Sequence, residues 1–118
     1  MNPALTVDQP DAEAALWDVF SAFGGVRLWL EDTTAGYPFW YSTQVIRVQC
    51  SDATKEDAYA RASLVEDIIL GQEGAAWEDG RVIAVRVEEG PRWAPTENGG
   101  PRYEAAYALT VRPLDGGI

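Results

Sequence analysis

A chain of 118 residues, 47% of them hydrophobic, can bury one sizeable core but is too short for two ordinary domains, so we expect a single folded domain. Its 19 acidic and nine basic residues give a net charge of −10, which excludes a generic nucleic-acid-binding role because phosphates would be repelled. With no histidine and a single cysteine, Cys50, the chain cannot form an internal disulfide, a histidine-dependent catalytic triad or the usual zinc ligand sets.

The first predicted element is a helix over 11–23. Residues 1–10 carry little pattern and are interpreted as an N-terminal extension, and either Asp8 or Asp11 can cap the helix that follows. The residues expected to face the core recur at helical spacing: Ala12, Leu16, Val19, Phe20 and Phe23. Trp17 falls on the opposite side of this helix, so we expect it to be exposed.

Four strands are predicted from the alternation of apolar and polar residues. Their ranges are 26–30, 39–50, 81–88 and 103–111. The residues expected to face the core are Val26, Leu28, Leu30, Ile46, Val48, Cys50, Ile83, Val85, Val87 and the odd-numbered positions of the last strand. Two intervening segments, 31–38 and 90–101, are rich in turn-forming residues and are predicted to be loops.

A second helix is predicted over 54–70. Thr54 and Asp57 have the spacing of a capping box at its start. One apolar line along it is expected to pack on the sheet: Ala58, Ala62, Val65 and Ile69. The order α-β-β-α-β-β predicts an α+β fold, a mostly antiparallel four-stranded sheet with two helices packed on one face and the other face partly open. This domain would span 11–113 and be followed by a flexible C-terminal tail, 114–118.

The remaining motifs do not indicate catalysis. Adjacent carboxylates could perform acid–base work or hold a divalent metal, but these pairs lie at strand ends or on the polar side of a helix, which favours a solvated acidic surface. The pairs are Glu31-Asp32, Glu66-Asp67, Glu78-Asp79 and Glu88-Glu89. We therefore expect no catalytic, cofactor-binding or metal site, and no cofactor. No stretch approaches the ~20 apolar residues of a membrane span and no secretory signal is present, so we expect the protein to be intracellular where it is made and to have no membrane contact.

Aromatic and arginine side chains instead indicate binding to other proteins. Trp93 stands with Arg92 and Pro95 in the predicted loop 90–101, where it could dock on a partner or fold back over the sheet. The aromatic segment 37–41 contains no basic residue, which favours core packing or a protein interface over base stacking. The residues predicted to contact partners or further copies of the chain are Trp17, Trp29, Trp40, Tyr41, Arg92, Trp93, Pro95 and Arg102.

Three features of residues 11–113 together resemble the tail terminator proteins of long-tailed bacteriophages. They are the amphipathic N-terminal helix, the segment YSTQVIRVQCSDATKEDAYARASLVEDIIL, and the closing pair GRVIAVRVEEGPRWAPTENGGPRYEAAYALTVRP. The resemblance implies a structural subunit that forms a ring of six copies, docks on the last ring of the tail tube protein and later contacts the head-side connector or stopper protein. It also implies that the protein is made in the host cytoplasm and ends up in the virion, at the junction of tail and head.

In such a ring, genomic DNA passes through without specific binding. Basic side chains along the bore would gain counterion-release free energy at each phosphate and retard the strand, whereas carboxylates would repel it. We therefore expect an acidic bore, for which the candidates are Glu66, Asp67, Glu88 and Glu89. The alternative is that the acidic residues are spread over the outside as solubilising charge.

Two other classes of function fit the same residues. One is a neck or head-completion protein, whose small domains have a similar arrangement of elements. The other is a small dimeric α+β ligand-binding module or enzyme that buries its open sheet face against a second copy. A solution mass and a ligand screen would separate this dimer from a ring.

Overall fold

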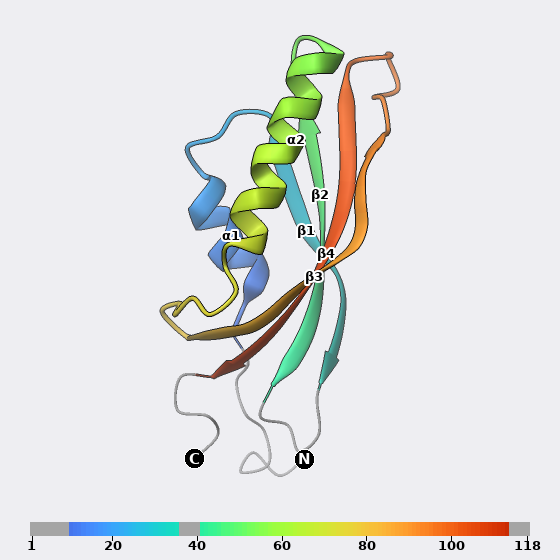
Figure 1. Cartoon of the computed structure of the whole chain (residues 1–118). Coiled ribbons are helices and arrows are strands. Elements are labelled where there is room, and N and C mark those ends of the chain that lie inside the picture. Colours follow the sequence, from blue (N-terminus) through green and yellow to red (C-terminus); the bar gives the residue numbers. More distant parts are fainter. Residues whose placement is uncertain (1–9, 36–40, 114–118) are drawn as a thin grey trace.

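The fold is α+β, with two helices and four antiparallel strands in the predicted order α-β-β-α-β-β. The computed structural model describes residues 10–35 and 41–113 (Figure 1). The elements are α1 (Ala12–Phe20), β1 (Val26–Ala35), β2 (Ser42–Ser51), α2 (Lys55–Leu70), β3 (Gly80–Trp93) and β4 (Arg102–Pro113). The sheet has the order β1-β2-β4-β3, so β1 and β3 are its edges. The predicted tail 114–118, and most of the predicted extension 1–10, lie outside the described residues.

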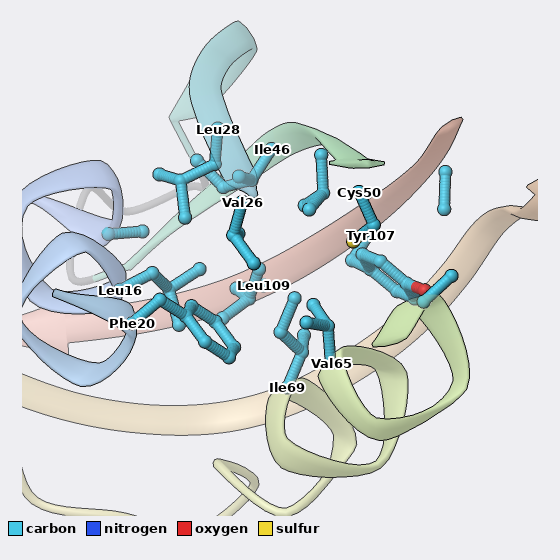
Figure 2. Packing of buried hydrophobic residues seen from close by; sticks show 14 of the residues in the cluster. Leu16, Phe20, Val26, Leu28, Ile46, Cys50, Val65, Ile69, Tyr107 and Leu109 are labelled. Carbon is cyan, nitrogen blue, oxygen red and sulfur yellow. The ribbon is translucent and has the colours of Figure 1, made fainter. Parts of the chain in front are cut away.

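Both helices pack on the same face of the sheet and enclose one core (Figure 1). Figure 2 shows side chains from α1, α2, β1, β2 and β4 meeting in a single cluster. Its buried members are Ala12, Leu16, Phe20, Val26, Leu28, Ile46, Val48, Cys50, Ala62, Val65, Ile69, Val82, Ala105, Tyr107, Leu109 and Val111. The alternation predicted for β2 and β4 and the apolar line predicted for α2 are thereby confirmed.

The helix starts follow from local capping. Asp11 accepts a hydrogen bond from the backbone N–H of Ala14 at 3.0 Å, and Thr54 accepts one from Asp57 at 3.1 Å. The first helix ends at Phe20, three residues earlier than predicted, because the N–H of Phe23 turns back to the carbonyl of Phe20 at 2.9 Å. Phe23 still packs against the core, whereas Val19 is exposed, contrary to prediction.

A buried amide fixes how α1 approaches the sheet. Gln44, on the core face of β2, donates hydrogen bonds to the carbonyl of Pro10 at 2.7 Å and to Oγ of Ser42 at 3.2 Å. Its Oε1 accepts from the backbone N–H of Ala12 at 3.0 Å, so both ends of the amide are satisfied. Pro10 lies so close to Gly80 that a Cβ there would meet Cγ of Pro10 at 2.1 Å. The chain is therefore held against both β2 and β3 before α1 begins.

The edge strands are longer than predicted and contain bulges. β1 continues through the predicted loop 31–38 as far as Ala35, and the pairing shifts between Leu30 and Asp32. Beyond the bulge, Thr33 and Thr34 pair with β2, a position that suits β-branched residues. Leu30 is exposed rather than buried: its N–H donates to Glu13 of α1 at 2.7 Å, but its side chain lines an open groove at the sheet edge.

The inward residues predicted for β3 are only partly correct, because this strand contains bulges and lies at the edge of the sheet. Its pairing with β4 shifts between Val82 and Ala84 and again between Val87 and Glu89, which resets the alternation each time. Val82 is fully buried, while Ile83, in the first bulge, is 45% exposed. Val87 lies opposite Tyr107 on the core side but is 40% exposed at the sheet edge. Of the three residues predicted to face inward, only Val85 packs against the core.

We predict that Gln44→Leu lowers the free energy of unfolding by about 2 kcal/mol, because it leaves the Ala12 N–H and the Pro10 carbonyl without their partner. Urea unfolding would measure this loss of stability. Relative to the parent protein, amide hydrogen exchange in the variant should accelerate more in α1 than in β4. As a control, Ser42→Ala removes one partner of Gln44 and keeps the bonds to Pro10 and Ala12, so it should cost less. Equal stability of Gln44→Leu and the parent protein would contradict this assignment.

Candidate interaction surfaces

The predicted docking residue Trp93 lies at the end of β3, not in a loop. After a shift between Glu89 and Arg92 the strand resumes, so that Arg92 pairs with Glu104 and Trp93 with Tyr103. Pro91 is tolerated because β3 is an edge strand, whose N–H groups are not all needed for pairing. The loop between β3 and β4 is therefore shorter than predicted, covering 94–101.

Trp93 belongs to a small cluster that we call the aromatic tip, made of Lys55, Tyr59, Trp93 and Tyr103. The Trp93 and Tyr103 rings meet edge to face with centroids 5.4 Å apart, and Tyr59 meets Tyr103 in the same way at 5.3 Å. The ammonium of Lys55 lies 4.9 Å from the centroid of the Trp93 ring. The cluster lies where α2 begins and β3 turns into β4, at one end of the molecule (Figure 1).

The aromatic tip combines fixed geometry with exposure. Trp93 is 42% exposed and Tyr59 is 53% exposed, although each ring packs against Tyr103. Of the two alternatives considered for Trp93, the indole folds back onto the sheet, while docking on a partner stays a prediction for its exposed surface. Aromatic side chains held in one orientation lose little entropy on binding, which is why such residues anchor interfaces.

The loop beside the aromatic tip is held closed by its own hydrogen bonds. Arg102 donates to the carbonyls of Ala94 at 2.8 Å and Pro95 at 3.4 Å. Within the loop, Thr96 and Gly100 are joined by two further bonds of 3.0 and 2.8 Å. Arg102 is thus half-buried and occupied with the loop, while Pro95 remains exposed. The predicted contact of these two residues with a partner remains a prediction.

The sheet face away from the helices, which we call the open face, is organised by Arg47. Its guanidinium lies 2.8 Å from Glu31, 3.0 Å from Glu104 and 3.4 Å from Glu89. Arg92 reaches two of these carboxylates, pairing with Glu104 at 2.9 Å and with Glu89. We call these five residues the ion cluster. It joins β1, β2, β4 and β3 across the whole sheet, and Gln49 adds a bond to Glu104 at 2.8 Å.

The charges of the ion cluster stabilise one another. The hydrogen bond to Glu31 and the surrounding carboxylates hold the pKa of Arg47 above its usual range, although burial acts in the opposite direction. The hydrogen bond from Arg92 holds the pKa of Glu89 below its usual range. Two guanidinium groups face three carboxylates, so the ion cluster carries a net charge of −1 by this count.

A shallow groove of about 570 Å³ lies beside the ion cluster on the open face. It is lined by Glu31, Asp32, Thr34, Thr43, Val45, Arg86, Glu88, Glu89 and Ala106. Trp29 is on the same face, opposite Arg47 in the β1–β2 register, and is half-buried. Tyr41, just before β2, is exposed, and the predicted contact residue Trp40 lies outside the described residues.

The predicted contact residues therefore do not form one patch. Trp17 is exposed on α1, Trp29 and Arg92 lie on the open face, and Trp93 lies on the helix-bearing side. If they bind partners, they bind on different sides of the subunit.

Sequence reasoning missed Arg47, which it treated as one more outward residue of a strand, because the carboxylates that gather around it come from three other strands.

The four acidic bore candidates also separate within the subunit. Glu66 and Asp67 are on α2, whereas Glu88 and Glu89 are on β3, and Glu89 points to the open face. Glu66 accepts a hydrogen bond of 3.1 Å from the hydroxyl of the buried Tyr107, which Figure 2 shows directed toward α2. Glu88 pairs with Arg86. A single wall of one subunit cannot contain all four, and which of them faces a bore remains a prediction.

Few side chains in the described part of the chain could act as a nucleophile or bind a metal ion. Cys50 is buried, and burial raises the pKa of its thiol to about 11, so the interpretation as a core hydrophobe is confirmed. Within residues 10–35 and 41–113, no three of the Asp, Glu and Cys side chains gather as a metal ion would need. No helix of the same ranges is long and apolar enough to cross a membrane.

We predict that Arg47→Gln lowers the free energy of unfolding by about 1–2 kcal/mol, because three carboxylates then lose a shared cation that is only 17% exposed. Arg27→Gln removes the same charge from an exposed position of β1 and should change stability by less than about 0.5 kcal/mol. Chemical unfolding of both variants would measure the two losses of stability. Equal losses would mean that the ion cluster contributes only non-specific charge, and would contradict the prediction.

A second prediction concerns pH. Since the pKa of Glu89 is depressed in the folded state, its contribution to stability is present above the ordinary glutamate range and is lost as the pH falls through the folded value. Arg92→Gln should raise the pKa of Glu89 toward its ordinary value and weaken this acid sensitivity. Carbon-detected NMR titration would measure the pKa. Arg86→Gln on the same strand should leave the pKa of Glu89 unchanged, and an equal rise in both variants would contradict the pairing.

Comparisons with known proteins give no assignment for these surfaces. No protein-family model matches the chain, and no curated protein matches it at a significant level. A function for the chain therefore has to be argued from its residues and their geometry.

Proposed function

We propose that the protein is a structural subunit of a ring that terminates the tail tube of a long-tailed bacteriophage. The observation that carries the proposal is the sheet with two different edge strands, β1 and β3, and one open face. A ring needs each subunit to present two different surfaces to its two neighbours, because head-to-tail contacts close a ring whereas a self-complementary patch gives a dimer. The resemblance over residues 11–113 supplies the expected number of copies, six.

The two edges differ in a way that supports contact between unlike surfaces. β3 exposes Ile83 and Val87 along its length, whereas β1 exposes Leu30 beside a polar stretch that ends in Thr33 and Thr34. The connection from α2 covers the start of the β3 edge, with backbone hydrogen bonds to Gly80 and Val82. Along β1 and the rest of β3, edge backbone groups and exposed apolar side chains are a liability in a free monomer, because they invite association. A ring contact would cover them.

The aromatic tip is the proposed docking surface for the tail tube protein. Trp93 and Tyr59 are exposed and held in place, and Arg92 continues the surface toward the open face. Interfaces are enriched in Trp, Tyr and Arg for this combination of area and rigidity. The head-side connector would then contact the subunit elsewhere, and DNA would pass through the ring without specific binding.

The proposal is tested by mixing the purified chain with tail tubes polymerised from the tube protein of the same genome. We expect rings at one end of each tube in negative-stain images and a mass in solution that corresponds to rings once tubes are present. A stable dimer that never associates with tubes and whose melting temperature rises with a small molecule would favour the ligand-binding module. Binding at the head connector with no binding to tubes would favour a neck protein. Either result would overturn the proposal.

We predict that Trp93→Ala weakens tube binding at least about tenfold, because truncation of an interface anchor costs about 2 kcal/mol of binding free energy. Stability should fall by only about 1 kcal/mol, since the indole is 42% exposed and leaves Tyr103 paired with Tyr59. Co-sedimentation with tubes measures the first effect and thermal unfolding the second. Leu64→Ala removes an exposed apolar side chain from the middle of α2 and should leave tube binding unchanged. Unfolding of Trp93→Ala with normal binding per folded molecule would contradict the assignment.

A further inference from the structure

An apolar groove with acidic rims lies between α1 and the segment that connects α2 to β3. We call it the α1 groove, and its volume is about 620 Å³. It is lined by Asp11, Ala14, Ala15, Asp18, Val19, Trp77, Glu78 and Asp79. Figure 1 shows α1 and this connecting segment on the same side of the sheet. None of these residues belongs to the aromatic tip or to the ion cluster.

The walls of the α1 groove are fixed by hydrogen bonds. On one wall, Trp77 packs against the core, and its indole N–H donates to Oε1 of Gln72 at 3.0 Å. Its backbone N–H also donates to the carbonyl of Gly80 at 2.6 Å. The two walls are joined directly, since the backbone N–H of Asp11 donates to the carboxylate of Asp79 at 3.2 Å. These hydrogen bonds hold the two walls in place, and the groove is already open in this structure.

The floor of the groove is apolar, and none of the residues that the structure describes covers it. Ala14 and Ala15 are short, so they leave room between Val19 on the helix and Trp77 on the opposite wall. Val19 is 36% exposed although its spacing predicts a core residue. An aliphatic or aromatic side chain of a partner would bury both Val19 and Trp77 at little entropic cost to the groove.

The rims of the groove are acidic and carry no countercharge. Asp11, Asp18, Glu78 and Asp79 surround the apolar floor, and in the described part of the chain no Arg or Lys forms an ion pair with any of them. The contrast with the open face is clear, because there Arg47 and Arg92 neutralise the carboxylates that gather around them. The α1 groove leaves its negative charge available to a partner.

We propose that the α1 groove binds a basic segment of a partner protein. One aliphatic or aromatic side chain of the segment enters between Val19 and Trp77, and flanking Arg or Lys side chains pair with Asp18 and Glu78 at the rims. Nucleic acid is disfavoured as the occupant because its phosphates would face these carboxylates. The inference stands on the groove alone and does not depend on the proposed role in a tail.

The test uses the full chain to select binders from a displayed library of random 12-residue peptides. We expect the enriched peptides to contain at least two Arg or Lys residues beside an aliphatic or aromatic residue. The strongest peptide is then synthesised, and its Kd is measured by fluorescence anisotropy. In NMR spectra of the labelled chain, the shifted amides should be those of 14–19 and 77–79. Selection of acidic or neutral peptides, or of none, would overturn the proposal.

Three variants separate a specific groove from general acidic attraction. Val19→Ser removes the apolar contact, and Asp18→Asn with Glu78→Gln removes rim charge; each should weaken binding about fivefold or more. Asp67→Asn with Glu97→Gln makes the same change in net charge at exposed positions of α2 and of the β3–β4 loop, and should change Kd less than about twofold. Thermal unfolding verifies that each variant is folded.

The proposal fails if the control pair weakens binding as much as the rim pair, because the attraction would then be to the net charge of −10. It also fails if Val19→Ser has no effect. Sedimentation of the chain alone tests whether a second copy of the chain occupies the groove. Self-association that is lost in the Val19→Ser and rim variants would show this, and it would rule out a basic partner segment as the occupant.

Discussion

The packing of both helices against one face of the sheet determines the rest of this structure. α1 and α2, of nine and 16 residues, supply enough apolar surface to cover one face of four strands and cannot cover the other. Gln44 fixes this arrangement by tying the start of α1 to β2. One face of the sheet therefore packs into the core, and the opposite face has to be stable in contact with water or with a partner.

The open face meets that requirement with shared charges. Exposed ion pairs contribute little singly, but Arg47 serves three carboxylates from three strands, and Arg92 binds two of the same groups. Such a network stabilises a fixed arrangement of side chains and keeps the face polar. The small residues Ala106 and Ala108 are buried between these charged side chains, so a partner would meet a flat, polar surface with few apolar contacts. This chemistry favours the edges and the aromatic tip over the open face as apolar docking surfaces.

Elements with an uninterrupted period could be predicted from the sequence, and elements with bulges could not. β2 alternates along its whole length, and no bulge interrupts the pairing of β4 with β2, so Ile46 and Leu109 were expected in the core and are found there. Ile83 fits the same pattern, but the first bulge in β3 takes it out of the alternation, and a bulge leaves the composition of a strand unchanged. Val87 keeps the predicted side, opposite Tyr107, yet is exposed on an edge strand. Trp93 was recognised as unusual, yet its partners Tyr59 and Tyr103 depend on tertiary register. The α1 groove joins segments about 60 residues apart, which periodicity cannot bring together.

The distribution of charge connects these surfaces. The chain has nine basic residues for 19 acidic ones, and its cations are largely committed: Arg47, Arg61, Arg86 and Arg92 form ion pairs, Arg81 and Arg102 bind backbone carbonyls, and Lys55 lies over Trp93. A basic partner therefore competes with few internal cations when it approaches the α1 groove. Its attraction also begins before contact, because physiological salt screens charges over about 8 Å and several carboxylates act together within that range. By the same electrostatics, the excess of acid disfavours DNA and, in the proposed interaction, favours protein segments of opposite charge, among which the apolar floor would select.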